Sequence, residues 1–279
     1  MFCDDEKVDF VQRPPLSHSH AQTGSWSILI CLLGPFRLVN AHHAELEYGG
    51  ERVEMLLGYL ALHHTAALPR DMLLTLLWPD SDPALAGQSL NSLVYGVRKA
   101  LKEELGGAPP VIQNNGHYRL NCEVGVSVDI VQFEYFAQSG EQHARAGELH
   151  LADVCYHRAV EFYQGDLCVT PDPQTLIERE RLRARYLTLL MRLADASYGA
   201  QRYAESLSYV QRLLLYDPCR EDAHRLAMRC YVQMGERAQA FRQYRLCQEL
   251  LRHEFDAIPE QATVVLFDQI RRDQTSAPS

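Results

Sequence analysis

The chain has 279 residues, of which 47% are hydrophobic and 23% charged, and its formal net charge is -9. This composition predicts a packed protein long enough for two domains and excludes disorder throughout. No apolar run is long enough to cross a bilayer and the first residues are acidic, so we expect a cytoplasmic protein without a membrane partner. The cysteines are scattered singly and the adjacent histidines point in different directions, so we expect no metal site and no cofactor.

Residues 1–26 are polar and carry Pro14-Pro15, which predicts a mobile arm without a fold of its own. A small sheet is predicted to follow, with strands over 28–33, 36–39 and 44–48. The last of these strands alternates apolar residues with two glutamates, which is the pattern of a half-buried strand.

Apolar residues at helical intervals then predict three helices. The first covers 52–64 and the second covers 69–78. The third begins at Asp82-Pro83, because the missing N–H of proline has no intrahelical partner in a first turn, and Gly106-Gly107 is expected to stop it. After it, Asn115-Gly116 lies between two β-capable flanks and predicts a hairpin, since both turn residues must adopt positive φ.

The third predicted helix has two contrasting faces. Its predicted buried stripe consists of Ala86, Leu90, Leu93, Val94, Val97 and Leu101. Its opposite face consists of Gln88, Asn91, Ser92, Tyr95, Arg98, Lys99 and Lys102. Amides can bond adenine edges in pairs and cations can bond guanine or phosphate, so this face fits a DNA major groove. A plain solvated surface has the same composition, which by itself favours that simpler interpretation.

The hairpin shifts this balance toward nucleic acid. It places Asn114, His117 and Arg119 near a turn directly after the helix, where a wing can reach the sugar-phosphate chain. Two candidate contact elements in this order are harder to explain as an ordinary surface than one.

Four stretches carry a family resemblance: LLGPFRL (32–38), LLGYLALHHTAALPRDMLLTLLWPD (56–80), SLNSLVYGVRKAL (89–101) and NGHYRL (115–120). They resemble the response-regulator-type winged helix of Streptomyces antibiotic regulatory proteins. This resemblance implies a winged-helix DNA-binding domain over 27–126, built from a short N-terminal sheet, three helices and a C-terminal hairpin. It also implies that the third helix enters the major groove, and that Arg98 and Arg119 are the best phosphate contacts.

The second half is predicted to be helical from Asp129 onward, and it repeats at 34 residues. Ser206 aligns with Ala240 and Leu207 with Phe241, as in tetratricopeptide repeats. This half also resembles the bacterial transcriptional activator domain, which implies an all-α, tetratricopeptide-like array over 127–274, a tail over 275–279 and a mainly α fold for the whole chain. The run RERLRARY (179–186) interleaves arginine with glutamate, which predicts a salt-bridged surface.

Two functions of different classes fit these features. No catalytic or nucleotide-binding motif occurs, so we do not expect an enzyme. The first function is a transcriptional regulator, expected to be an activator, that binds double-stranded DNA and uses the array to contact RNA polymerase, a partner protein, a small-molecule effector or a second copy in a homodimer. The second is a scaffold whose repeats bind a protein or ligand and whose winged helix has weak or no DNA binding. Residues 27–126 hold seven Lys/Arg against ten Asp/Glu, and this acidic balance favours the scaffold.

Overall fold

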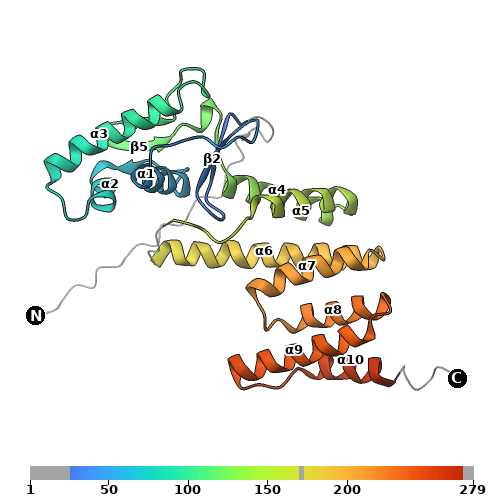
Figure 1. The fold of residues 1–279 in the computed structure, drawn as a ribbon. Helices are drawn as coiled ribbons and strands as arrows, with labels where there is room; N and C mark the ends of the chain where they lie inside the picture. The colour runs from blue at the N-terminus through green and yellow to red at the C-terminus, as the bar shows by residue number, and fades with distance from the viewer. Residues whose placement is uncertain (1–25, 170–172, 273–279) are drawn as a thin grey trace, which may run out of the picture.

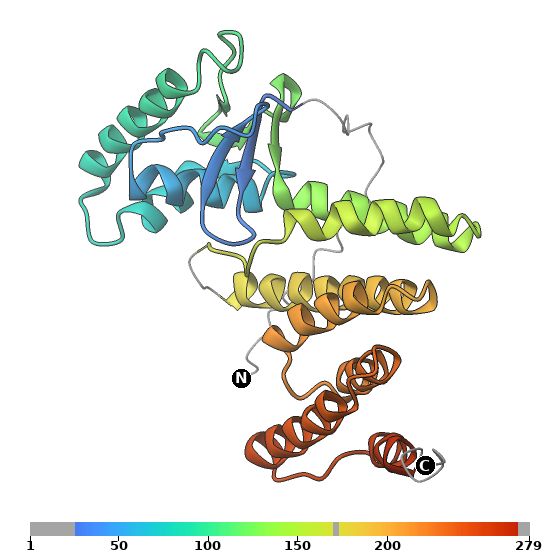
Figure 2. The ribbon, with the colours of Figure 1, turned by 45° about the vertical axis from the view of Figure 1, so that its right-hand side comes forward.

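The computed structural model describes residues 26–169 and 173–272. Apart from Trp26, the predicted arm lies outside these residues, and so does the predicted tail. The elements of the first half are β1 (Ile28–Cys31), β2 (Arg37–Asn40), α1 (Glu51–Leu62), β3 (Leu68–Pro69), α2 (Arg70–Leu77), α3 (Pro83–Ala100), β4 (Val111–Asn114), β5 (His117–Leu120), a 3-10 turn (Cys122–Val124) and β6 (Val126–Val128). The second half contains α4 (Asp129–Arg145), α5 (Leu149–Phe162), α6 (Pro173–Gly199), α7 (Tyr203–Tyr216), α8 (Glu221–Gln233), α9 (Arg237–Phe255) and α10 (Gln261–Arg272). Figures 1 and 2 show the two halves stacked, with α3 at one extremity and α9 and α10 at the other.

The first sheet has the strand order β2-β1-β6, and β1 is buried along its whole length. Its alternating side chains face two separate clusters, because successive residues of a strand point to opposite sides. Ile28 and Ile30 join the main core, while Leu29 and Cys31 pack with Trp26 and Phe162 on the other face. A strand covered on both faces explains the continuous apolar run in the sequence.

The third strand of this sheet differs from the prediction. Residues 44–48 form no strand and make only an isolated bridge between Val39 and Glu45. The Asn40 side chain accepts the N–H groups of His42 and Ala44, which closes a tight turn beside the strand end. The third strand is β6, which runs parallel to β1. The predicted domain boundary between 126 and 127 therefore falls inside a strand of this sheet.

The predicted hairpin is confirmed. β4 and β5 pair in an antiparallel register around Asn115 and Gly116, whose φ angles are 46° and 74°. β3 pairs with the other edge of β5, so the hairpin is held as part of a three-stranded sheet. The wing is therefore fixed to the segment that leads into α2.

The helical half confirms the predicted repeat. α7 begins at Tyr203 and α9 begins at Arg237, which is the predicted spacing. Small residues lie at the helix crossings: Ser206 is fully buried and its hydroxyl donates to the carbonyl of Ala194, while Ala240 is fully buried against Met228. Successive helices pack side by side from α4 to α10 (Figure 1). None of the helices in the described part of the chain is long and apolar enough to cross a membrane.

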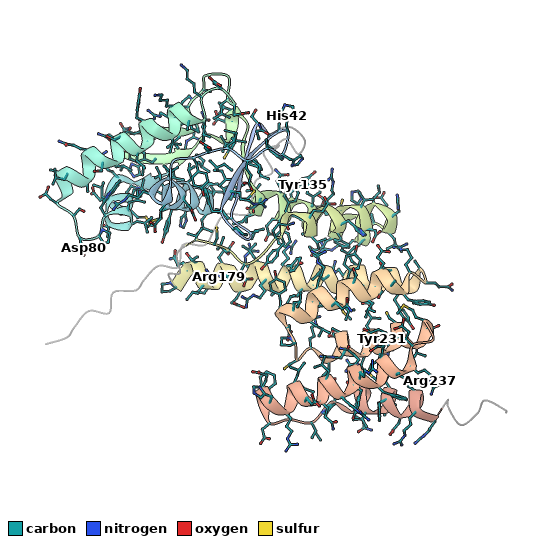
Figure 3. All side chains as sticks on the ribbon, in the orientation of Figure 1. His42, Asp80, Tyr135, Arg179, Tyr231 and Arg237 are labelled. Carbon is teal, nitrogen blue, oxygen red and sulfur yellow. The ribbon has the colours of Figure 1, made fainter. Side chains whose placement is uncertain are left out.

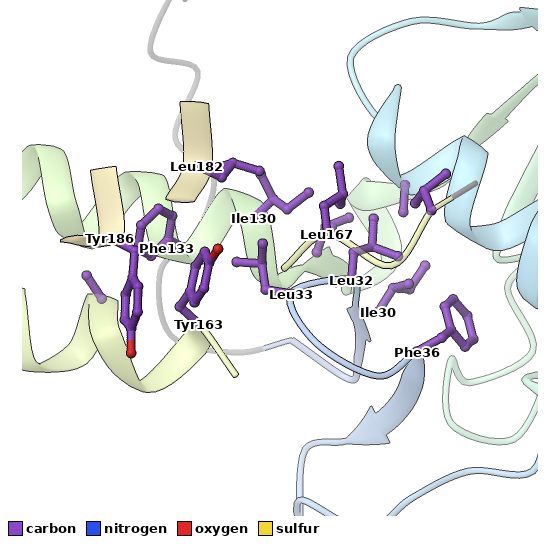
Figure 4. Close-up of a cluster of buried hydrophobic side chains, with 14 of the residues drawn as sticks. Ile30, Leu32, Leu33, Phe36, Ile130, Phe133, Tyr163, Leu167, Leu182 and Tyr186 are labelled. Atoms are coloured by element: carbon purple, nitrogen blue, oxygen red, sulfur yellow. The ribbon is translucent and has the colours of Figure 1, made fainter. Parts of the chain in front are cut away.

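One core runs through the junction of the two halves. Figure 4 shows Leu32 and Leu33, which follow β1, beside side chains of α4 and of the segment after α5. At the centre of this junction Asp129 is 2% exposed, and its Oδ2 accepts the N–H groups of Leu32 and Leu33 at 2.8 Å each. Burial raises the pKa of Asp129 to about 7, although these N–H donors act in the opposite direction. The two halves thus meet through packing and buried hydrogen bonds.

The arginine run on α6 is a salt-bridged surface, as predicted. Arg181 pairs with Glu178 and Glu134, and Arg185 pairs with Glu134 on α4. Arg179, labelled in Figure 3, instead donates to backbone carbonyls of the preceding segment. These cations hold helices together, so they are poor candidates for contacts to nucleic acid.

Candidate nucleic-acid interface

α3 forms because its ends and its apolar stripe agree. The Asp82 carboxylate accepts the N–H groups of Ala84 and Leu85, which caps the helix at its predicted start. The predicted stripe is confirmed: five of its members are buried and Leu93 is half-buried. This stripe packs on α1 and α2. The helix ends at Ala100, earlier than predicted, and 101–107 form turns.

The polar face of α3 is open to solvent over most of its length. Gln88, Asn91, Ser92, Tyr95 and Lys99 are all exposed, with Tyr95 at 68%. Figures 1 and 2 place this helix on the outside of the molecule, far from α8, α9 and α10. Figure 3 shows side chains projecting outward along it, from the loop that holds Asp80 to its other end. The array therefore does not cover the face that the sequence singles out.

The three predicted cations of this face differ in their surroundings. Lys99 and Lys102 are exposed, although Lys102 lies in the turn after the helix. Arg98 is half-buried, and its Nη2 donates to the carbonyl oxygen of Val111 at 3.0 Å. Its Nε is buried without a hydrogen-bond partner. The guanidinium thus ties α3 to the first residue of the wing, which makes Arg98 less available to phosphate than the two lysines.

Asn114, His117 and Arg119 lie on one face of the wing, because Asn114 pairs with His117 and Arg119 is two residues further along β5. Asn114 and His117 are exposed at its tip, next to the Asn115-Gly116 turn. Arg119 is 41% exposed and forms a 3.5 Å ion pair with Glu123. An exposed pair of this kind is weak and is screened by salt, so a phosphate can replace the glutamate. Arg119 consequently remains an available cation.

One residue that the sequence did not single out joins α3 to the wing. Arg70, the first residue of α2, donates from Nη1 to Asn91 Oδ1 at 3.0 Å and to the hydroxyl of Tyr118 at 2.8 Å. Its Nη2 donates to the carbonyl oxygen of Gly87 at 2.7 Å. A glycine inside a helix was the available signal, because it often marks a close approach. The partner of Gly87 was not visible, since Arg70 lies in a different element.

The described residues contain no group of three or more His, Cys, Asp or Glu side chains that could hold a metal ion. The geometry of the interface is that of a projecting polar helix beside a hairpin tip. Such a shape fits the groove and backbone of a duplex.

Comparison with known proteins agrees with this architecture. Residues 128–271 match the family described as the bacterial transcriptional activator domain. Regulatory protein AfsR of Streptomyces coelicolor is 24% identical over 254 residues, which cover 91% of this chain and 25% of AfsR. Regulatory protein DnrI of Streptomyces peucetius is 25% identical over 240 residues, which cover 82% of this chain and 87% of DnrI. The chain thus spans a quarter of the length of one relative and most of the other.

A solved structure shares the fold. Mycobacterium tuberculosis EmbR in complex with a low affinity phosphopeptide superposes with a TM-score of 0.65 at 19% identity, over 89% of this chain and 66% of that one. The predicted fold class, mainly α with a winged helix before a helical array, is confirmed. The resemblance to Streptomyces antibiotic regulatory proteins is confirmed as well. Because the family match covers more than half of its residues, the chain belongs to the bacterial transcriptional activator domain family.

Proposed function

We propose that this protein is a transcriptional regulator that binds double-stranded DNA in a sequence-dependent way, with α3 in the major groove and the β4–β5 hairpin as a wing on the adjacent backbone. One observation carries the proposal: the amide, hydroxyl and ammonium groups of α3 share one exposed face while its opposite face is packed. The relatives AfsR and DnrI, both named regulatory proteins, support it.

The roles within this interface follow from exposure and bonding. Gln88, Asn91 and Tyr95 face outward on α3, where a docked helix reads base edges. Lys99, Lys102 and Arg119 supply charge for phosphates, while Ser92 and the wing residues Asn114 and His117 offer shorter polar contacts. We assign Arg98 a positioning role, because its guanidinium is engaged by the wing backbone.

The helical array is proposed to contact protein and to support activation of transcription. Leu215, Phe255 and Ile258 are exposed apolar residues at 81%, 68% and 86% on α7, on α9 and after α9. A homodimer, RNA polymerase, another partner protein and an effector that acts through the array are the candidates. Attachment to a second DNA-bound partner raises the effective concentration of the domain, and this offsets the small number of cations on its surface.

An electrophoretic shift with genomic fragments at low ionic strength tests the proposal. The full chain is expected to retard a subset of the fragments. Replacing Lys99, Lys102 and Arg119 together by alanine is expected to abolish this shift. A matched control replaces Arg242, Arg245 and Arg252, which are exposed on α9, and removes the same charge at the opposite end of the molecule. Equal binding by the triple interface variant and the wild type would contradict the proposal.

The acidic balance of residues 27–126 favours a second function, a protein-binding scaffold. In that case the wild type retains no fragment at any salt concentration, and a partner protein binds through the array. The same shift assay separates the two functions, because only the regulator shows a retarded fragment.

A further inference from the structure

The contacts of Arg70 fix the orientation of an amide on the proposed reading face. An arginine guanidinium carries only hydrogen-bond donors, so the Asn91 atom that it contacts must be the carbonyl oxygen. The Asn91 amino group then lies on the side away from Arg70. Because Asn91 is exposed, this amino group is presented to solvent, and in a complex it is presented to the partner.

Three further contacts of Arg70 hold its guanidinium in the position that orients the Asn91 amide. Its guanidinium also holds the Tyr118 hydroxyl of β5 and the Gly87 carbonyl of α3, and its backbone N–H donates to the carbonyl of Gly116 at the wing turn. Tyr118 is fully buried, so the position of its hydroxyl is set by the packing of the wing sheet. Arg70 therefore has little freedom to turn away from Asn91.

Gly87 leaves space for the guanidinium in this arrangement. A Cβ atom at position 87 would lie 2.8 Å from Nη2 of Arg70, which is closer than two such atoms approach. Glycine in a helix interior is unfavourable, by about 1 kcal/mol relative to alanine, so its presence here agrees with the need for space beside the guanidinium.

The orientation of the Asn91 amide and the positive charge of Arg70 both favour guanine over adenine as the contacted base. Paired recognition of adenine needs an amide oxygen free to accept from the N6 amino group. In this protein one of the two lone pairs of that oxygen already accepts from Arg70, and the positive guanidinium beside it disfavours the approach of a second donor. Guanine presents only acceptors, O6 and N7, at its major-groove edge, and both suit an outward amino group.

We propose that Arg70 is a specificity-determining positioning residue: it turns the Asn91 amide so that this position of α3 selects an acceptor-only base edge, guanine in preference to adenine. The inference rests on the proposed function and adds to it the chemistry of one contact.

Selection from a random duplex library with the full chain at low salt tests it. The base pair read by Asn91 is identified as the position whose preference disappears in Asn91→Ala. The wild type is expected to prefer guanine there. In Arg70→Met, which frees the amide oxygen and removes the charge, the guanine-to-adenine ratio at that position is expected to fall about tenfold while other positions keep their preferences.

Two further variants distinguish a change in base preference from a folding defect. Gly87→Ala keeps the charge but displaces the guanidinium, so it is expected to shift the same position in the same direction. In the Asn91→Ala background, Arg70→Met is expected to change nothing at that position. Arg242→Met, on the exposed side of α9, serves as the charge control and is expected to leave all preferences unchanged.

The outcomes separate this inference from the proposed function. If the selection enriches sequences with adenine at the position that Asn91 reads in the wild type, the inference about Arg70 is wrong but the proposed function stands. The same conclusion follows if an Arg70→Met or Gly87→Ala variant binds all sequences more weakly with an unaltered preference there. If the wild type enriches no sequence at all, the proposed function is overturned and the role of Arg70 in base selection is overturned with it.

Discussion

Lys99 and Arg98 are neighbours in the sequence, yet replacing Lys99 by alanine is expected to change DNA binding, whereas replacing Arg98 is expected to change folding stability. Lys99 is exposed on the proposed DNA face, whereas Arg98 donates to the carbonyl of Val111 at 3.0 Å. Each phosphate that a cation neutralises contributes about 0.9 to the slope of log K against log salt concentration. Lys99→Ala is therefore expected to reduce the magnitude of this slope by about 0.9, which corresponds to a roughly 3.5-fold smaller loss of affinity between about 50 and about 200 mM salt.

For Arg98→Ala the expected effect is on folding. The variant loses a charge-assisted hydrogen bond that joins α3 to the wing, a change that costs about 1.5–3 kcal/mol of unfolding free energy before any gain from solvation of the half-buried site. Its salt slope is expected to equal that of the wild type.

Fluorescence anisotropy with a duplex retained by the wild type, titrated at several salt concentrations, gives the slopes. Urea unfolding gives the stabilities. Arg242→Ala on α9, a helix that lies far from α3 (Figure 1), is the control for loss of one positive charge. An unchanged slope for Lys99→Ala, or an equal reduction for Arg98→Ala, would refute this division of roles.

Three predictions concern the stability of the fold, and each is measured as the free energy of unfolding in urea. Burial raises the pKa of Asp129 from 3.8 to about 7, so between these pH values its carboxyl binds more protons in the native state than in the unfolded state. Its contribution to stability therefore falls as pH rises from 3.8 to about 7. Asp129→Asn should abolish this pH dependence, and its persistence in the variant would contradict the assignment. Gly140→Ala should destabilise the α4–α5 pair by about 1–3 kcal/mol, since a Cβ would overlap the ring of Tyr156; a neutral effect would show that the helices separate freely. Glu221→Ala should weaken docking of α10 by about 1 kcal/mol, because the carboxylate accepts the N–H of Glu260 near the start of that helix, whereas an unchanged stability would exclude this capping role.

Local chemistry made several parts of this structure predictable. Asn115-Gly116 fixed the wing turn because few other pairs adopt two positive φ angles, and Asp82-Pro83 fixed the start of α3 because both residues suit a helix N-terminus. The stripe on α3 was predictable for a similar reason, since periodicity alone determines which side of a helix can be buried.

Contacts between distant segments were not predictable in the same way. β6 pairs with β1 although most of the winged helix lies between them, and no local pattern specifies that partner. The alternation in 44–48 instead indicated a third strand there, but the turn at Asn40 leaves that segment with one bridge.

The same limit applies to the site. Exposure of Lys99 and Tyr95 followed from the helical period, whereas the bonds of Arg98 to Val111 and of Arg70 to Asn91 depend on how the wing packs against α3. These bonds determine which cation is free and which way an amide points. They belong to tertiary structure, and a residue-by-residue pattern cannot show them.

The proposed function requires the exposed face of α3 to enter a major groove. Chemical footprinting on a duplex that the wild type binds can show this contact, because dimethyl sulfate modifies guanine N7 in the major groove and hydroxyl radicals report on the backbone. The wild type is expected to protect guanines in one major groove together with the backbone beside it, where the wing lies, and Asn91→Ala is expected to weaken protection at one of these guanines. Retention of the duplex without any major-groove protection would contradict the claim.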